Sequence, residues 1–214
     1  MPEPEVRHPL FARVYAWASP RMEKAGYGRR RRRLLAGLSG RVLEVGAGNG
    51  MNFAHYPPEV THVTAVEPEP HLRELARAKA ERAAVPIEVV AGTAERLPAG
   101  DASVDAVVAT LVLCTVPDVP ATLAEVRRVL RDGGELRFLE HVRAEAPGLA
   151  LVQRALDATV WPRCAGGCHT HRDTRRAIER AGFSITDLET PRIPDTPIPA
   201  PTAPHILGTA TKQA

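Results

Sequence analysis

The chain alternates between two patterns of apolar residues. Short runs of mostly apolar and β-branched residues, bounded by glycine, proline or charged residues, predict strands, and blocks with apolar residues at helical spacing predict helices. Helices are expected between strands at residues 70–84, 120–130 and 172–181. Strands that alternate with helices are typical of an α/β fold with crossover helices. We expect seven strands, at residues 42–45, 62–67, 87–91, 104–110, 135–140, 183–189 and 205–212.

Two further segments lie outside this alternation. Before the first strand, apolar residues at helical spacing predict a helix at 9–26, and a second helix at 29–38 should end near Gly37. Between the last two strands, residues 191–204 hold six of the 20 prolines. We expect this stretch to be extended and exposed, and not a domain linker, because a strand follows it.

Length and composition predict one domain. The 214 residues, 44% of them hydrophobic, are enough to bury a sizeable core. We therefore expect a single domain at 1–214, with a helical cap at 1–38, an α/β core at 41–214 and an insertion at 144–170.

Charge and aromatic content bear on the binding partner, and cysteine content bears on the cellular compartment. A net charge of +3 and 4% aromatic residues, without a basic stripe, argue against a nucleic-acid partner. Three cysteines without a paired framework and an N-terminus without a secretory signal favour a cytoplasmic protein. Since no stretch approaches the roughly 20 apolar residues that span a bilayer, we expect no transmembrane segment.

The most informative segment runs from an apolar strand into three closely spaced glycines. Glycine lets a ligand approach the backbone directly, so this loop predicts a nucleotide-type cofactor site. The third glycine, Gly50, comes too early for the G-x-G-x-x-G spacing of dinucleotide-binding proteins. Residues of the loop and its flanks expected to contact the cofactor are Glu44, Gly46, Ala47, Gly48, Asn49, Gly50 and Asn52.

A carboxylate ends the second predicted strand. Glu67 follows the glycine loop at about the 20-residue spacing at which an acid of nucleotide-binding folds accepts hydrogen bonds from ribose hydroxyls. We assign Glu67 this role, with Pro68 beside it at the cofactor. The alternative is a solvated glutamate at a strand end.

The pattern Glu-x-Gly-x-Gly-x-Gly from Glu44 resembles motif I of the class I S-adenosylmethionine-dependent methyltransferases. This resemblance implies a Rossmann-like seven-stranded sheet in the order 3-2-1-4-5-7-6 with strand 7 antiparallel, helices capping the site, and S-adenosylmethionine as cofactor with S-adenosylhomocysteine as product. It also places Glu95, in the loop with Thr93 and Ala94, near the adenine amino group. The alternative for Glu95 is an acid at a helix start.

The loop after the fourth predicted strand has two interpretations. Its residues from Thr110 and Leu111 to Cys114 could form the floor of the adenine site or shape the transfer site, or they could be plain core packing. We count Thr110 and Leu111 among the cofactor-binding residues.

Several later motifs narrow the resemblance. They are Thr-Leu-Val-Leu-Cys from Thr110, Glu-Val-Arg-Arg-Val-Leu-Arg-Asp-Gly-Gly from Glu125, Glu-His-Val from Glu140, Gly-Cys from Gly167 and Pro-His-Ile-x-Gly-x-Ala from Pro204. Together they resemble the methyltransferase-like group that includes the animal alkyl-thiol S-methyltransferases, over residues 42–212. The helices at 9–38 stand where the animal proteins have a membrane-anchoring segment, so we do not expect membrane attachment to carry over.

The resemblance implies a small-molecule acceptor, with a thiol sulfur as the first hypothesis. A hydroxyl, an amine or a quinone ring carbon is the alternative acceptor, and a protein that binds the cofactor without catalysis is the alternative function. Methyl transfer mainly requires alignment of the reacting atoms, so few catalytic side chains are needed. His141, just past the fifth strand, is the candidate base because imidazole titrates near neutral pH. Its alternative role is a hydrogen-bonded histidine at a strand end.

Cys164, Cys168, His169 and His171 lie close together in sequence and could suggest a zinc site. Their spacing matches no common zinc pattern, and we expect no metal there. We expect the surrounding residues 144–170 to form an apolar wall above the methyl group, because Val152, Leu156, Val160 and Trp161 lie at helical spacing. Trp161 is expected to pack in the core.

Five consecutive arginines occupy positions 29–33. On a helix they would spread around much of the circumference, so part of the run should extend along the surface. We interpret the run as a solvated helix and not as a site for an anionic membrane or nucleic acid.

Overall fold

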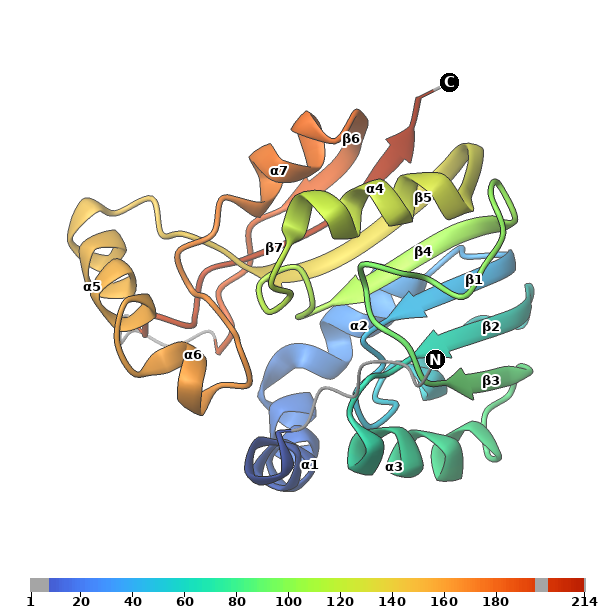
Figure 1. Ribbon diagram of the computed structural model, residues 1–214, viewed down its shortest axis with the longest axis horizontal. Helices are drawn as coiled ribbons and strands as arrows, with labels where there is room; N and C mark the ends of the chain where they lie inside the picture. The colour runs from blue at the N-terminus through green and yellow to red at the C-terminus, as the bar shows by residue number, and fades with distance from the viewer. Residues whose placement is uncertain (1–7, 195–199, 214) are drawn as a thin grey trace.

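The computed structural model describes residues 8–194 and 200–213. A seven-stranded sheet in the order β3-β2-β1-β4-β5-β7-β6 forms its centre (Figure 1). β7 runs antiparallel to both β5 and β6, and the other neighbouring strands are parallel. The fold and strand order expected from the sequence are confirmed. The strands are β1 (Gly40–Val45), β2 (Val60–Val66), β3 (Ile87–Val90), β4 (Val104–Thr110), β5 (Leu130–His141), β6 (Phe183–Glu189) and β7 (His205–Lys212).

Helices cover both faces of the sheet. α4 and α7 lie on one face, and α2 and α3 lie on the other, with α1 packed against α3 (Figure 1). A 3-10 turn, η2 (Phe53–His55), follows the glycine loop. The α-helices are α1 (Pro9–Met22), α2 (Gly28–Leu35), α3 (Pro70–Ala80), α4 (Val119–Val129), α5 (Pro147–Asp157), α6 (Trp161–Cys164) and α7 (Thr174–Arg180).

The central strand β1 has buried side chains on both faces of the sheet. Side chains alternate across a strand, so Leu43 and Val45 enter the core beneath α4 and α7, and Val42 enters the core beneath α2 and α3. A parallel strand covered by helices on both faces is therefore apolar almost throughout.

Several element boundaries differ from the sequence-based expectations, among them the start of β5, at Leu130 and not at residue 135. The two N-terminal helices meet at a kink within η1 (Glu23–Tyr27), where Gly26 has a non-helical φ of +123°. α3 ends at Ala80, before the expected residue 84, and α7 begins at Thr174 because the Asp173 side chain caps it by accepting from the Arg176 amide.

The proline-rich segment is only partly as expected. Ile193 and Ala203 are buried and pack against the domain, and Arg192, which is exposed, forms a β-bridge with Pro204. Residues 195–199 of this segment, like residues 1–7 of the expected cap, lie outside the described residues.

The carboxyl ends of the parallel strands all point to the left in Figure 1, where α1, α5 and α6 lie. Open α/β sheets bind their ligands at this edge. In the described part of the chain, no helix combines the length and hydropathy needed to cross a membrane.

Candidate functional site

The glycine loop after β1 forms a backbone surface with no room for side chains at two positions. Gly46 has φ +62°, and a Cβ there would lie 2.6 Å from Cγ2 of Val112. Gly48 has φ +56°, and a Cβ there would lie 3.3 Å from Cε1 of Tyr15. Glycine is therefore required both by the left-handed backbone and by the closeness of the β4 loop and of α1.

Glu67, just past the end of β2, lies directly against this loop. Its carboxylate accepts from the Gly48 amide at 2.7 Å and from the Glu69 amide at 2.9 Å. Burial raises the pKa of Glu67 to about 7, because a charged carboxylate loses hydration there. Pro68 follows, and its carbonyl accepts from Arg73. The structure thus brings together the two features that the sequence analysis assigned to one cofactor.

Glu44 and Asn52 lie beneath the loop and do not face open space. The Glu44 carboxylate accepts from the Tyr56 hydroxyl at 2.6 Å and from Asn52 Nδ2 at 3.0 Å. Asn52 Nδ2 also donates to Thr110 Oγ1 at 3.1 Å. Both side chains are buried and already satisfied, so they shape the loop from below. Burial raises the pKa of Glu44 to about 7.

One arginine of the five-residue run belongs to this network. Arg31 Nε is 2.8 Å from Glu23 Oε1, and Arg31 Nη1 donates to Asn52 Oδ1 at 2.8 Å. Arg31 is 4% exposed, so the interpretation of the run as a solvated helix is wrong at this position. The exposed Arg33 pairs with Asp187 and Glu189 on β6, as a surface residue would. The burial of Arg31 could not be predicted from the sequence, because an unbroken run of arginines gives no indication of which one faces inward.

Helix α1 closes over the glycine loop. Tyr15 contacts Gly48, and Asn49 Nδ2 donates to Ser19 Oγ at 2.8 Å. Ala47, at the start of the loop, is held by a bond from its amide to the Val66 carbonyl. The expected cap is therefore in contact with the expected cofactor loop.

Two buried acceptor atoms near this edge have no partner among the described residues. They are Oδ1 of Asn49 in the glycine loop and Oε1 of Glu95 in the loop after β3. Ala94 beside Glu95 is buried, and Thr93 forms a bridge with Arg96 that closes this short loop. A buried acceptor without a partner costs free energy, and a ligand that donates hydrogen bonds can recover it.

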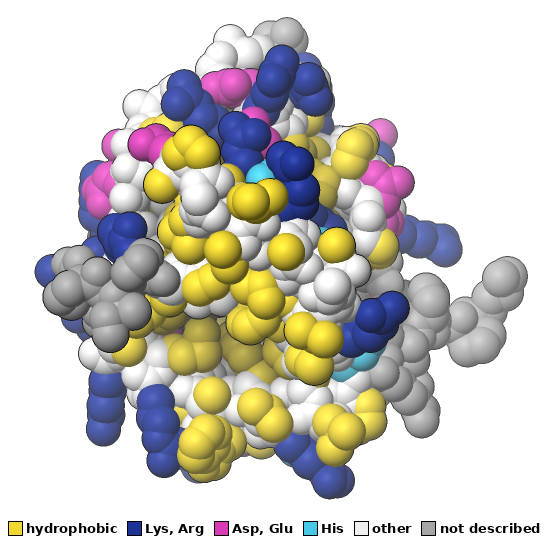
Figure 2. All heavy atoms as spheres, turned by 90° about the vertical axis from the view of Figure 1, so that its left-hand side faces the viewer, with side chains coloured by type: hydrophobic (Ala, Val, Ile, Leu, Met, Phe, Trp, Pro, Cys, Tyr) yellow, Lys and Arg dark blue, Asp and Glu magenta, His cyan; other side chains and the backbone are white. Residues whose placement is uncertain are grey.

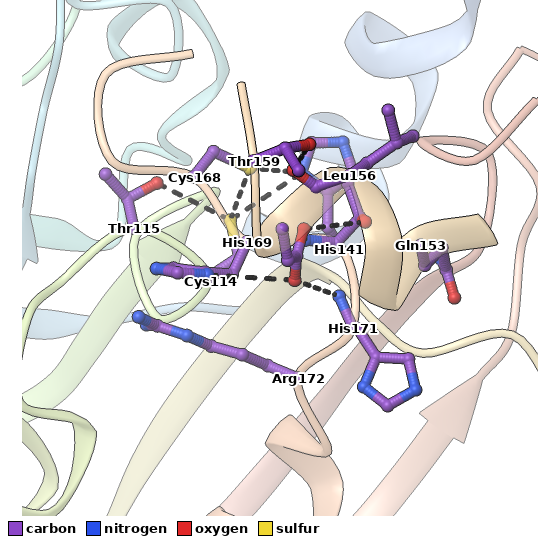
Figure 3. A network of polar contacts seen from close by, with 12 residues as sticks. Cys114, Thr115, His141, Gln153, Leu156, Thr159, Cys168, His169, His171 and Arg172 are labelled. Carbon is purple, nitrogen blue, oxygen red and sulfur yellow. Dashed lines mark hydrogen bonds and ion pairs between the residues drawn. The ribbon is translucent and has the colours of Figure 1, made fainter. Parts of the chain in front are cut away.

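A second cluster lies at the ends of β4 and β5 (Figure 3). His141 Nδ1 is 3.6 Å from Cys114 Sγ and 3.5 Å from Cys168 Sγ, and the two sulfur atoms are 3.8 Å apart. In the sequence, His141 and Cys168 stand out for separate reasons, and Cys114 belongs to a loop expected at the adenine floor, at the transfer site or in the core. The structure joins all three.

The four-residue group suggested by sequence proximity does not form. Cys164 is exposed, and no group of possible metal ligands in the described chain contains it, His169 or His171. Asp157, at the end of α5, accepts from the amides of Thr170 and His171 and so fixes the loop that carries Cys168. Cys168 alone turns toward the strand ends.

The two buried thiols influence each other's ionisation. Hydrogen bonding with Cys114 and contact with His141 lower the pKa of Cys168, and the same thiol pair together with burial raises the pKa of Cys114. The cluster therefore favours ionisation of Cys168 over ionisation of Cys114.

The loop that carries Cys114 is held from both sides. The buried Glu140 carboxylate accepts from the amides of Val112, Leu113 and Cys114 at 2.9, 3.0 and 3.1 Å. Arg172 Nη1 donates to the Leu113 and Val116 carbonyls at 2.7 Å each. Leu111, with φ +60°, begins the turn, and its amide bonds to the Leu139 carbonyl. These contacts join segments distant in sequence, so sequence patterns could not reveal them.

The apolar wall expected from residues 144–170 is only partly present. Val152 is 47% exposed and Val160 is 58% exposed, so both face solvent, while Leu156 and Trp161 are half-buried. Gln153 instead anchors α5, because it accepts from the Ala144 amide and donates to the Val142 and Pro201 carbonyls. Figure 2 shows apolar side chains gathered over this face with a recess among them. The exposed large apolar residues of α1, α5 and the turn before α6 are Leu10, Val14, Trp17, Leu151, Val152 and Val160.

Comparison with known proteins assigns a family to this arrangement. Residues 43–138 match a family model described as a methyltransferase domain. The chain is 40% identical over 183 residues to thiol S-methyltransferase TMT1B of Homo sapiens, covering 83% of this chain and 74% of that protein. The chain belongs to this family of methyltransferases. The methyltransferase is also 39% identical over 187 residues to thiol S-methyltransferase TMT1A of Homo sapiens, covering 83% of this chain and 73% of that protein.

Solved structures support the same fold. A S-adenosylmethionine-dependent methyltransferase from Thermotoga maritima, described as a possible histamine N-methyltransferase, has a TM-score of 0.70 at 21% identity. The similarity covers 95% of the methyltransferase and 98% of that chain. At this identity the similarity concerns the fold alone.

Proposed function

We propose that this methyltransferase uses S-adenosylmethionine to methylate a thiol on a small, largely apolar acceptor. The observation that carries the proposal is the bond between the Glu67 carboxylate and the Gly48 amide. It joins the acid expected to bind a ribose to the loop expected to bind the rest of the donor. S-Adenosylmethionine, when bound, supplies a methyl group activated by a sulfonium.

The residues present suit such a donor. Backbone of Gly46 to Gly50 would receive the amino-acid part, and Glu67 would accept from the sugar hydroxyls. The unpartnered Oε1 of Glu95 suits the adenine amino group, and the unpartnered Oδ1 of Asn49 suits the donor's ammonium group. The remaining residues proposed to line the donor site are Pro68, Thr93, Ala94, Thr110 and Leu111.

Two observations favour a thiol as the group that accepts the methyl. The relatives named above are thiol S-methyltransferases, and the face above the strand ends is apolar (Figure 2). A thiolate is a strong nucleophile and is partly present at neutral pH, so alignment supplies most of the required catalysis. We propose that the α1–α2 segment acts as a lid over the donor and that α5 and α6 border the acceptor.

The donor assignment is tested by calorimetry with S-adenosylhomocysteine. Glu67→Gln removes the charge that favours hydrogen bonds from two hydroxyls, so we expect affinity to fall about 10–100-fold, which corresponds to about 1.5–3 kcal/mol. Glu74→Gln, exposed on α3, is the matched control and should bind like the wild type. Equal affinity of the Glu67→Gln variant and the wild type would refute the ribose assignment.

The acceptor assignment is tested by turnover with matched acceptors. We expect methylation of thiophenol and no methylation of phenol or aniline, measured by mass spectrometry of the product. Product from phenol or aniline alone would overturn the thiol assignment. Cofactor binding without product from any acceptor would favour a non-catalytic binding protein.

A further inference from the structure

Three soft donor atoms converge on one point at the acceptor side of the site. They are Sγ of Cys114, Nδ1 of His141 and Sγ of Cys168, and they come from the ends of β4 and β5 and from the loop after α6 (Figure 3). Cys114 and Cys168 are buried, and His141 is half-buried. Thiolate and imidazole are the ligands that zinc prefers.

The distances among these atoms fit a tetrahedral metal. Zinc binds thiolate at about 2.3 Å and imidazole at about 2.0–2.1 Å, so tetrahedral angles place two sulfurs about 3.8 Å apart and sulfur about 3.6 Å from nitrogen. The observed separations are 3.8 Å between the sulfurs, and 3.6 and 3.5 Å from the sulfurs to Nδ1. All three edges of the triangle agree with one ion bound to all three atoms at these bond lengths.

The backbone of both cysteines is fixed before any ion arrives. The Cys114 amide donates to Glu140, and the Cys114 carbonyl accepts from the His169 amide at 2.7 Å, which ties the Cys114 loop to the residue after Cys168. Asp157 holds the next two amides along that loop. A ligand set held in this way loses little conformational freedom on binding.

The His141 ring is oriented by a second histidine that is itself fixed. The rings of His141 and His205 are in contact, with centroids 4.5 Å apart and planes tilted by 44°. His205 Nδ1 donates to the Ala203 carbonyl at 2.8 Å, so its Nε2 accepts from the Tyr27 hydroxyl at 2.8 Å. Both nitrogens of His205 are occupied, which leaves His141 as the nitrogen ligand. Such outer contacts set ligand orientation in metal sites.

We propose that Cys114, His141 and Cys168 bind a zinc ion whose fourth position receives the sulfur of the acceptor thiol. This proposal rests on the proposed function. Within the described chain, these three residues are the ligand group that the structure brings together, and three protein ligands with one open position are typical of catalytic zinc. Val112, two residues before Cys114, contacts Gly46, so the ion would lie beside the loop proposed to hold the donor.

The ion would supply the nucleophile without a base. The two cysteine thiols would release their protons to solvent when zinc binds, and the acceptor thiol would likewise release its proton to solvent when its sulfur becomes the fourth ligand. The acceptor sulfur then forms a bond to the methyl carbon, the bond from that carbon to the sulfonium sulfur breaks, and its electron pair remains on the donor sulfur. The thioether product is neutral and a weaker ligand, so it leaves the ion.

Metal binding to the full chain tests the site directly. After zinc loading and dialysis, we expect about one zinc ion per chain by elemental analysis. Cobalt in place of zinc should give a thiolate-to-metal charge-transfer band and the intense d–d bands of a tetrahedral site. Cys114→Ser and Cys168→Ser should lose the zinc and the charge-transfer intensity, and Cys164→Ser, which alters an exposed cysteine outside the cluster, should keep both.

Acceptor binding to the cobalt protein tests the fourth position. Thiophenol should shift the d–d bands, and phenol should not. Wild-type protein that binds no zinc at micromolar concentration, or whose Cys114 and Cys168 form a disulfide in its place, would overturn the proposal. Equal zinc content in the wild type and the two cluster variants would also overturn it. Binding of S-adenosylhomocysteine is measured separately. Protein that binds zinc but not S-adenosylhomocysteine would refute the proposed function. Protein that binds S-adenosylhomocysteine but not zinc would refute only the metal site.

Discussion

The two halves of the strand-end edge are built in different ways. On the proposed donor side, the glycine loop and Glu67 contact each other through backbone amides, and the two partners of the central bond are 19 residues apart. On the proposed acceptor side, Cys114, His141 and Cys168 meet through side chains, and 54 residues separate the two cysteines. A backbone surface can thus be encoded by a short motif, whereas a side-chain cluster depends on the assembled sheet and on the loops fixed to it.

The two halves also differ in what holds them in place. Beneath the glycine loop, Glu23 and Arg31 form an ion pair, and Arg31 donates a hydrogen bond to Asn52. At the acceptor side, the single carboxylate of Glu140 gathers three amides of one loop. If this distinction is right, substitutions on the two sides should separate donor binding from metal binding.

The largest effect is expected from Arg31→Gln. This variant leaves Glu23 without its guanidinium partner beneath the donor loop, which should lower the free energy of unfolding by about 3 kcal/mol in urea denaturation. Arg33→Gln, which removes only exposed pairs on the same helix, should cost less than about 1 kcal/mol. Equal costs would mean that the buried network does not stabilise the donor side.

Gly46→Ala should have an effect of comparable size. The added Cβ would overlap Val112, at a cost of about 1–3 kcal/mol, and the left-handed backbone would add about 1–2 kcal/mol. Gly37→Ala separates the two causes, because Gly37 has φ +74° and nothing within 4 Å of a Cβ. Thermal denaturation should therefore show only the backbone cost in the control, and S-adenosylhomocysteine affinity should fall only for Gly46→Ala.

Glu140→Gln tests how the loop that carries Cys114 is held in place. A neutral amide accepts less strongly than a carboxylate from the three loop amides, so we expect a loss of about 1–3 kcal/mol of stability and weaker zinc binding. Affinity for S-adenosylhomocysteine should stay within about twofold of the wild type. Glu145→Gln, exposed and nearby in sequence, should change neither quantity. A loss of donor affinity equal to the loss of zinc affinity would show that the two halves are not independent.

The proposed donor side should also show a pH dependence. Burial raises the pKa of Glu44 and Glu67 to about 7, so the folded protein holds protons that the unfolded chain has released. Their contribution to stability is full below about pH 4.5 and is lost as pH rises through about 7. Affinity for S-adenosylhomocysteine should increase over the same range, because the ionised Glu67 accepts hydrogen bonds best.

Urea denaturation and calorimetry at several pH values between these limits would measure both trends. Glu67→Gln should flatten the rise in affinity and reduce the slope of stability, and Glu74→Gln should leave both unchanged. A wild-type affinity that does not vary with pH would contradict the assigned role of the Glu67 charge.

Sequence patterns brought together the glycine loop and Glu67 but only part of the cluster of Cys114, His141 and Cys168, for a physical reason. The strand, glycine loop and Glu67 follow one another locally, so spacing alone placed them together. Cys114 looked like part of an apolar run, and Cys168 looked like part of a group with Cys164. A signal was nonetheless present, because cysteine and histidine at the ends of adjacent parallel strands must meet at one edge. Only the sheet order, which the resemblance supplied, makes β4 and β5 neighbours.

The reversed direction of β7 also has a practical use. Because this strand runs against β5, its first residue pairs with the last residue of β5, His205 beside His141, and the chain then leaves toward the opposite rim of the sheet (Figure 1). An affinity tag or surface tether attached after Lys212 would therefore emerge far from the reacting groups. Immobilised protein should keep its strand-end face open to solution, which suits it to screening thiol compounds on a sensor chip.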